Sequence, residues 1–272
     1  MYPDLQGKVV IVTGAGNKKG IGQGIAKRFA KEGCRVVIVN RAHPELKGEP
    51  DQLEKRKIEI EAMGATCLAV RCDVTNEHDV QAMVATVVRE FGRIDVLVNN
   101  VGGAQMNQVG PVIEMDSATW DGAMALNAKC AHLCARAVAK QLIAQGQGGK
   151  IVNISSQAGV HPEPGIGLYS CAKALINQYT RVLAMELCPN KINVNAVLPG
   201  TIMSEKLREV LEGLSGSKDQ PDEELAKLLP PIPWGRLQTP EDVAASAVWL
   251  ASAEADYITG ECILTTGGQT MD

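Results

Sequence analysis

The sequence predicts an α/β fold of the doubly wound kind, in which a parallel sheet of about seven strands carries helices on both faces. Two observations lead to this prediction. Short runs of β-branched and apolar residues, typical of buried strands, alternate with longer amphipathic stretches along the 272-residue chain. The first run is followed at once by a glycine-rich stretch that leads into an amphipathic helix.

The expected strands share a short length and a high content of valine, isoleucine and leucine. They fall at 8–13, 35–39, 66–71, 94–98, 150–154, 191–197 and 261–264. One expected helix follows the glycine-rich stretch and ends near residue 32, and another begins near residue 76. The others are expected at 51–63, 117–145, 168–188 and 240–251. The sequence contains no repeat and no inter-domain linker, so residues 1–272 are expected to form a single domain.

Two polar stretches interrupt this alternation. Residues 42–50 are polar and flanked by proline, which indicates a surface excursion. Residues 201–235 are rich in charge, glycine and proline, and offer few side chains to a core. We therefore expect 201–235 to be a mobile flap that closes over bound ligands.

The composition excludes several classes of partner. The net charge is −4, no basic tract is present and aromatic residues make up 3% of the chain, so no binding to nucleic acid is expected. No apolar run reaches membrane-spanning length, and residues 1–8 lack the apolar core of a signal peptide. The eight cysteines contain no C-x-x-C pair, which favours free thiols in a cytoplasmic protein over disulfides or a metal site.

A glycine-rich loop follows the first expected strand and opens the first expected helix. Glycine lets the backbone come close to a pyrophosphate, and the free N–H groups of a helix N-terminus attract the negative charge. An ordinary glycine turn is the alternative, but a strand before the loop and a helix after it favour phosphate binding. The residues expected to bind are Gly14, Gly16, Lys19, Gly20, Ile21 and Gly22.

The end of the second expected strand bears on which dinucleotide binds. An acid at this place would bind a free ribose 2′-hydroxyl, and the chain has Asn40 and Arg41 instead. A guanidinium suits a 2′-phosphate, and Lys18 and Lys19 could add positive charge on the same side. A solvated surface arginine is the alternative reading of Arg41. We expect NADP(H) to be the preferred cofactor, with NAD(H) as the alternative.

Polar residues also follow the third and fourth expected strands. Asp73, with Val74 after it, could accept a hydrogen bond from an adenine amino group or cap the helix that begins near Asn76. The fourth strand ends in a run of small and amide residues, which the family resemblance described below implies to lie beside the cofactor. These are Asn100, Val101 and Gly102.

Tyr169 and Lys173 are four residues apart in an expected helix and so lie on one face, one turn apart. A nearby ammonium favours the phenolate, so we expect Lys173 to lower the pKa of Tyr169 from its usual value of about 10. Such a phenol is a usable proton donor and acceptor. The spacing alone is a weak motif. Ser156 at the end of an expected strand and Asn127 in an expected long helix favour a catalytic role for the pair. Ser155 is expected to point to the other face of its strand.

Together these motifs resemble the short-chain dehydrogenase/reductase family over nearly the whole chain. The matching motifs are Thr13-Gly14…Gly20-Ile21-Gly22, Asp73-Val74, Asn99-Asn100-Val101-Gly102, Asn127, Ser156, Tyr169-x-x-x-Lys173 and Pro199-Gly200. The glycine loop is two residues longer than the family's, so which glycine packs against the adenosine stays open. Val101 and Cys171 depart from the more usual residues, and both changes are small.

The resemblance implies a Rossmann-like fold in which residues 8–155 bind the cofactor. It also implies an oxidoreductase that interconverts a secondary alcohol and a ketone by hydride transfer. The implied catalytic tetrad is Asn127, Ser156, Tyr169 and Lys173. The residues implied to lie along the nicotinamide and its ribose are Tyr169, Lys173, Pro199, Gly200, Thr201 and Ile202.

The resemblance also implies a role for each tetrad residue. Ser156 would position the substrate oxygen, Tyr169 would transfer the proton, Lys173 would bind the ribose hydroxyls, and Asn127 would hold a water. An enoyl reductase of the same fold is disfavoured because such enzymes space the tyrosine and lysine more widely. A catalytically idle binding protein is disfavoured because the tetrad is intact.

The substrate itself is open, since the candidate lining residues mix polar and apolar groups. They are Gln105, Gln157, His161 and Met203, with Met106 and Glu163 beside them. Ala131, Ala135 and Ala139 are expected on the outer face of the helix that carries Asn127. Small residues there would allow close helix packing between subunits, and the resemblance implies a homo-oligomer, either a dimer or a tetramer.

Overall fold

The computed structural model describes residues 1–41, 52–217 and 220–271. Its sheet has seven parallel strands in the order β3-β2-β1-β4-β5-β6-β7. The expected fold is therefore confirmed, and each strand lies within two residues of its expected bounds. The strands are β1 Val9–Thr13, β2 Arg35–Asn40, β3 Cys67–Arg71, β4 Val96–Asn99, β5 Gly149–Ile154, β6 Ile192–Pro199 and β7 Cys262–Thr265. The excursion expected at 42–50 lies outside the described residues.

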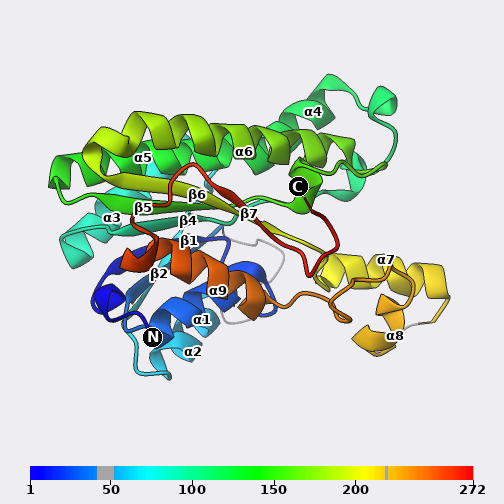
Figure 1. Cartoon of the computed structure of the whole chain (residues 1–272), viewed down its shortest axis with the longest axis horizontal. Coiled ribbons are helices and arrows are strands. Elements are labelled where there is room, and N and C mark those ends of the chain that lie inside the picture. The colour runs from blue at the N-terminus through cyan, green and yellow to red at the C-terminus, as the bar shows by residue number, and fades with distance from the viewer. Residues whose placement is uncertain (42–51, 218–219, 272) are drawn as a thin grey trace.

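Helices form a layer on each face of this sheet (Figure 1). One layer contains α3 (Glu77–Phe91), α5 (Cys130–Gln145) and α6 (Gly167–Leu187). The other contains α1 (Ile21–Lys31), α2 (Gln52–Glu61) and α9 (Pro240–Ala251). The remaining helices are α4 Ser117–Met124, α7 Glu205–Ser215 and α8 Asp222–Ala226. None of the helices in the described part of the chain combines the length and the apolar character needed to cross a membrane.

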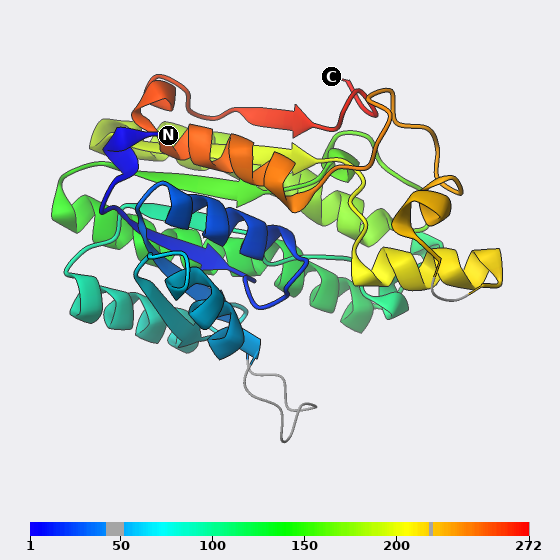
Figure 2. The same ribbon diagram turned by 90° about the horizontal axis from the view of Figure 1, so that it is seen from below.

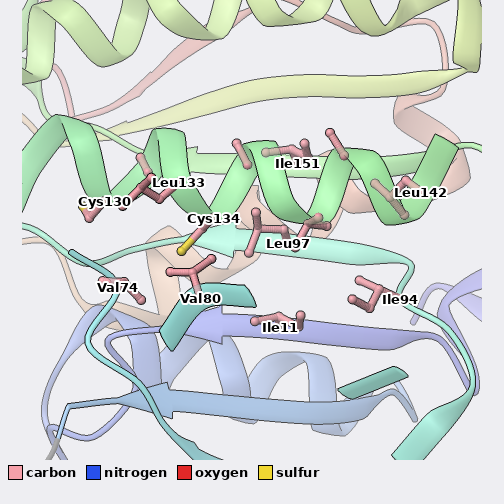
Figure 3. Close-up of a cluster of buried hydrophobic side chains, with 14 of the residues drawn as sticks. Ile11, Val74, Val80, Ile94, Leu97, Cys130, Leu133, Cys134, Leu142 and Ile151 are labelled. Atoms are coloured by element: carbon pink, nitrogen blue, oxygen red, sulfur yellow. The ribbon is translucent and has the colours of Figure 1, made fainter. Parts of the chain in front are cut away.

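The two cores are filled by alternate residues of the same strands. Val9 and Ile11 of β1 belong to the cluster under α3, α5 and α6, whereas Val10 and Val12 belong to the cluster under α1, α2 and α9. This follows from the pleat, which sends successive side chains to opposite faces. A strand covered on both faces must then be largely apolar, and in β1 every residue is apolar up to Thr13 at its end. Figure 3 shows the first cluster, where Ile11, Leu97 and Ile151 of three neighbouring strands lie near Leu133, Cys134 and Leu142 of α5.

The small residues of α5 lie on its inner face, which corrects the prediction made for them. Ala131, Ala135 and Ala139 are only 6%, 0% and 6% exposed and belong to the core between α5 and the sheet. Their spacing of four residues places them on one face of the helix. That face packs on the sheet because alanine allows the helix to approach the strands closely.

The carboxyl ends of the strands form the edge that carries the expected site. β1 pairs with β2 on one side and with β4 on the other, so the chain leaves β1 and β4 in opposite directions. In open parallel sheets, ligands bind in the crevice that such a reversal of strand order creates. Both ribbon views show α7 and α8 beyond this edge (Figures 1 and 2).

The segment expected to be a flap, 201–235, contains more regular structure than its composition suggests. Helix α7 begins where the Ser204 hydroxyl accepts a hydrogen bond from the Leu207 amide at 3.1 Å, and it ends at Gly216 with a left-handed backbone. Leu211 in α7 and Leu225 in α8 are buried. Helix α7 is therefore amphipathic, although charged residues and glycine dominate the composition of the stretch.

Candidate active site

The reacting side chains expected from the sequence meet where β5 ends against α6. The Lys173 ammonium is buried and donates a hydrogen bond to the carbonyl oxygen of Ile154, the last residue of β5, at 2.9 Å. The Ser155 hydroxyl donates to the Lys173 carbonyl oxygen at 3.1 Å. Ser156 therefore faces the other way. Its hydroxyl accepts from the Ala158 amide at 3.1 Å and lies near enough to the Tyr169 hydroxyl to oppose the rise in that group's pKa. The choice of Ser156 over Ser155 agrees with this geometry.

The pKa of Tyr169 differs from the sequence-based expectation. Burial raises the pKa of the phenol, the hydrogen bond with Ser156 opposes that rise, and the negative charge of Glu163 adds to it. The Lys173 ammonium lies 5.5 Å from the centre of the tyrosine ring, with its hydrogen bond directed at Ile154. The expected lowering by Lys173 is therefore wrong for this structure: burial raises the pKa of the phenol, and Lys173 is not among the groups that lower it. The same burial lowers the pKa of Lys173 to about 8.

Asn127 lies in a short π-helical turn, Ala125–Lys129, that separates α4 from α5. The single helix expected at 117–145 is thus interrupted at the candidate residue itself, and such insertions are frequent at functional sites. The Asn127 carboxamide accepts from the Gly103 amide at 2.7 Å and donates to the carbonyl oxygens of Gly103 and Ala123, both at 3.1 Å. Both of its N–H donors are used, so its side chain positions the loop after β4.

Gly102 in that loop brings Asn127 and Lys173 together. A Cβ atom at Gly102 would lie 2.8 Å from Asn127 Oδ1 and 2.9 Å from Lys173 Nζ. A side chain at this position would displace Asn127 or Lys173, so glycine lets the backbone of the loop lie directly against both residues.

The glycine loop is packed by residues from the ends of β1, β2 and β4. Gly14 has a φ of +69°, a conformation that favours glycine, and a Cβ atom at Gly22 would lie 2.5 Å from the Gly14 carbonyl oxygen. A Cβ atom at Gly16 would overlap the Asn40 side chain. Gly20 stands at the N-cap of α1, with Ile21 as the first helical residue. The loop therefore presents its backbone and the N-terminus of α1, which suits a pyrophosphate.

Eight of the residues expected to bind the cofactor line one cavity of about 320 Å³. They are Gly14, Asn40, Arg41, Asp73, Val74, Asn100, Val101 and Gly102. Asp73 accepts hydrogen bonds from the Thr75 hydroxyl and amide, at 2.7 and 2.9 Å. These bonds, and to a smaller degree the charge of Arg41, hold the pKa of Asp73 below its usual value. The alternative role of Asp73 as a helix cap is wrong, because Asn76 caps α3.

Lys19 does not share this cavity. It lines a different one, of about 640 Å³, together with Gln23, Ile202, Met203 and Asp222. Lys18 lines the same second cavity, so the structure does not show either lysine beside Arg41, and their action on the 2′-phosphate side stays a prediction.

Asn100 and its neighbours fasten the loop after β4 to the end of β1. The Asn100 carboxamide donates to the carbonyl oxygens of Thr13 and Gly14, at 2.9 and 3.3 Å. The Thr13 hydroxyl accepts from the amides of Asn100 and Val101, at 2.9 and 3.4 Å. These bonds keep the first and fourth strands in register at the mouth of the cavity.

The stretch after β6 is held by two glutamines that the sequence-based analysis did not single out. The Gly200 amide donates to Gln238 Oε1 at 2.9 Å, and the Thr201 amide donates to Gln269 Oε1 at 3.1 Å. Ile202 makes an isolated parallel bridge with Gln238. Neither glutamine belongs to a recognisable motif, and only the fold brings them to Pro199-Gly200.

A third glutamine, Gln23, was also not foreseen. It is 1% exposed, and neither polar atom of its carboxamide has a hydrogen-bond partner among the described residues. A buried amide without a partner is costly. It lines the larger cavity next to Gly20, where a phosphate oxygen could accept its hydrogen bond. The residues at this edge of the sheet therefore fit a nicotinamide dinucleotide.

The four candidate substrate residues fall in different settings. Gln157 is buried, and its carboxamide is already hydrogen-bonded to Glu163 and Thr270. Gln105 forms a capping box with Gln108 at the start of a short helical turn. His161 is exposed in the loop before α6. Met203 lines the cavity that contains Lys19.

A family model described as enoyl-(acyl carrier protein) reductase matches residues 14–270. The chain is 35% identical to the 2-dehydro-3-deoxy-D-gluconate 5-dehydrogenase of Dickeya dadantii over 97% of its own length and 96% of that protein's. The chain belongs to the short-chain dehydrogenase/reductase family. It is also 35% identical to the galactitol 2-dehydrogenase of Agrobacterium fabrum, covering 98% of this chain and 99% of that protein.

A solved structure shows the same fold in a related dehydrogenase. The crystal structure of a short-chain alcohol dehydrogenase homologue from Sinorhizobium meliloti 1021 superposes with a TM-score of 0.83 at 31% identity and covers 98% of each chain. The present chain is accordingly a short-chain alcohol dehydrogenase, and membership of this family implies NAD(P)(H) as cofactor.

The buried Lys173 gives a pH-dependent signature in the protein without cofactor. Its pKa, about 8 in the fold, lies below the 10.5 of an unfolded lysine, so between these values the unfolded chain binds more protons. The free energy of unfolding of the wild type should then rise relative to Lys173→Met as the pH rises from 7.5 to 10, by roughly 1–3 kcal/mol. Urea unfolding at each pH measures the difference.

Lys140→Met, at an exposed position of α5, controls for the loss of one lysine. A difference between the wild type and Lys173→Met that stays constant over this pH range would contradict the burial of a titrating ammonium.

Proposed function

We propose that the protein interconverts a secondary alcohol and a ketone, with Tyr169 as the proton-transferring group. The observation that carries this proposal is the junction of Ser156, Tyr169 and the buried Lys173 at the carboxyl end of β5. The nicotinamide cofactor of the family supplies or accepts the hydride. The protein contributes orientation and proton transfer.

The proposed roles follow from the contacts of each side chain. Ser156 donates a hydrogen bond to the substrate oxygen, next to the Tyr169 hydroxyl. Tyr169, whose raised pKa keeps it protonated at neutral pH, gives its proton to that oxygen in reduction and recovers it in oxidation. Lys173 provides the positive charge beside the ring. Asn127 is a positioning residue that holds Gly103 and, through Gly102, the backbone next to Lys173.

The relatives favour a polyhydroxylated substrate. The Agrobacterium relative acts on galactitol and the Dickeya relative on 2-dehydro-3-deoxy-D-gluconate, according to their names. Both compounds carry several hydroxyl groups. The description of the family model names an enoyl reductase, but the spacing of four between Tyr169 and Lys173 favours alcohol dehydrogenation. We therefore propose a sugar alcohol or a related sugar derivative as the substrate class.

Tyr169→Phe tests the proposed proton transfer. The substitution removes only the phenolic proton, so kcat for polyol oxidation should fall by roughly 10²–10⁴-fold while cofactor affinity changes little. Steady-state absorbance of the reduced nicotinamide and a fluorescence titration of cofactor measure the two quantities. Tyr179→Phe, on the same helix but hydrogen-bonded to His132, should keep the wild-type rate. Wild-type turnover by purified Tyr169→Phe would show that another group transfers the proton.

We propose NADP(H) as the preferred cofactor. Asn40 places no carboxylate where a ribose 2′-phosphate would lie, and Arg41 lines the same cavity with its side chain exposed. A hydrogen bond to a charged group contributes roughly 1.5–3 kcal/mol, so a preference of roughly 10–1000-fold is expected. The expected contact with the 2′-phosphate is assigned to Arg41 alone, since Lys19 lines the other cavity.

Asn40→Asp combined with Arg41→Ala should reverse this preference. The new carboxylate would repel a 2′-phosphate and accept from a free 2′-hydroxyl. Values of kcat/KM with NADP⁺ and NAD⁺ measure the ratio. Arg35→Ala, at the other end of β2, is the matched loss of an exposed arginine and should leave it unchanged. A wild-type preference for NAD⁺ would contradict the proposal, as would an unchanged ratio of the two kcat/KM values in the double variant.

We also propose a homo-oligomer formed through α6. The alanines of α5 are buried and cannot form the contact between subunits. Helix α6 instead carries an exposed apolar stripe, in which Leu175, Val182 and Met185 are 47%, 44% and 78% exposed. Leu175→Glu with Val182→Glu should lower the sedimentation coefficient, whereas Ile58→Glu, at an exposed position of α2, should not. A wild-type monomer at micromolar concentration would contradict the proposal.

A further inference from the structure

We propose that the carboxylate of Glu163, fixed by Gln157, makes the substrate cleft selective for uncharged polyhydroxylated alcohols over sugar acids. This inference rests on the proposed function and narrows its substrate class. The relatives do not decide the point, because galactitol is uncharged and 2-dehydro-3-deoxy-D-gluconate is an acid.

Gln157 ties three segments together next to Ser156. It directly follows Ser156 and is 6% exposed. Its Nε2 donates to Glu163 Oε1 at 3.2 Å, and its Oε1 accepts from the Thr270 hydroxyl at 3.1 Å. The turn after β5, the loop before α6 and the C-terminal stretch after β7 thus meet at one buried amide.

The donor and acceptor directions in this chain of hydrogen bonds make Glu163 an acceptor. An ionised carboxylate can only accept, so the amide N–H of Gln157 must face it and the amide oxygen must face Thr270. Thr270 is itself held, because its backbone amide and carbonyl are both hydrogen-bonded to the Thr266 hydroxyl, at 3.2 and 2.9 Å. The carboxylate is therefore positioned from within the fold although Glu163 is exposed.

The second carboxylate oxygen of Glu163 remains available to a ligand. Within the described residues, neither an ion pair nor a further side-chain hydrogen bond involves this carboxylate besides the one from Gln157. Its charge reaches the reacting phenol, since it contributes to the raised pKa of Tyr169. The hydrogen bond from Gln157, the residue after Ser156, holds this negative charge beside the segment that carries the proposed substrate-binding hydroxyl.

This charge distinguishes the two kinds of substrate. A hydroxyl group next to the reacting carbinol can donate to Glu163, and hydrogen bonds to an ionised acceptor are about twice as strong as neutral ones. A substrate carboxylate has no proton to donate and is repelled. Selectivity of this kind needs both the attractive and the repulsive contact.

Galactitol and galactonate are a suitable pair of probes, because they differ in a terminal alcohol against a carboxylate. At low ionic strength the wild type should oxidise galactitol with a kcat/KM at least roughly tenfold above that for galactonate, since juxtaposed like charges disfavour binding. In Glu163→Gln the ratio should fall several-fold, and galactonate should become a tighter competitive inhibitor. Glu254→Gln, an exposed carboxylate in a turn that follows α9, should retain the wild-type ratio.

Two substitutions of Thr270 test the positioning by Gln157. Thr270→Val removes the hydroxyl that holds the amide, so selectivity should weaken while turnover of galactitol is largely retained. Thr270→Ser restores the hydroxyl and should restore the ratio. Equal selectivity in all three proteins would overturn the role of the bridge.

The outcomes separate this inference from the proposed function. Galactonate turnover equal to or above that of galactitol in the wild type, or a ratio unchanged in Glu163→Gln, would overturn the selectivity alone. No change in nicotinamide absorbance with any polyol or sugar, using either cofactor, would overturn the proposed function and the selectivity with it. Loss of the preference at high salt supports an electrostatic origin.

Discussion

The burial of the Lys173 ammonium is the constraint on which the rest of the site depends. A buried cation is tolerated only where a fixed acceptor compensates its lost hydration, and here that acceptor is the Ile154 carbonyl oxygen. This bond requires the end of β5 to lie next to the turn of α6 that carries Lys173. The Ser155 hydroxyl then closes on the Lys173 carbonyl, which leaves Ser156 free to meet Tyr169. The arrangement of the reacting groups is thus a consequence of how one helix is fastened to one strand.

The cofactor side of the site is built in a similar way, by polar side chains at strand ends that hold neighbouring backbone. Asn100 joins the end of β4 to the end of β1. Asn99, one residue earlier, donates to Asn153 of β5 at 3.0 Å, and Asn153 donates to Thr180 of α6 at 2.9 Å. These side chains hold the ends of β1, β4 and β5 and helix α6 together beside the cavity that Asn100 lines.

Much of this could be predicted from the sequence because strands covered on both faces must be largely apolar. That requirement located all seven strands, and the order of Ser156, Tyr169 and Lys173 along the chain located their junction. Periodicity was less informative for α5, since it shows which residues share a face but not which face turns inward. The positions of Gln238, Gln269 and Thr270 depend on contacts between segments far apart in sequence, which no local pattern reveals.

The π-helical turn at Asn127 explains why one long stretch serves two purposes. An α-helix advances 3.6 residues per turn, so one inserted residue rotates everything beyond it by about 100°. Before the turn, α4 packs against α6. After it, α5 directs Ala131 and Ala135 onto the sheet. An uninterrupted helix could not place Asn127 against Gly103 and also keep the alanine face inward. The local irregularity therefore reconciles core packing with the geometry of the site.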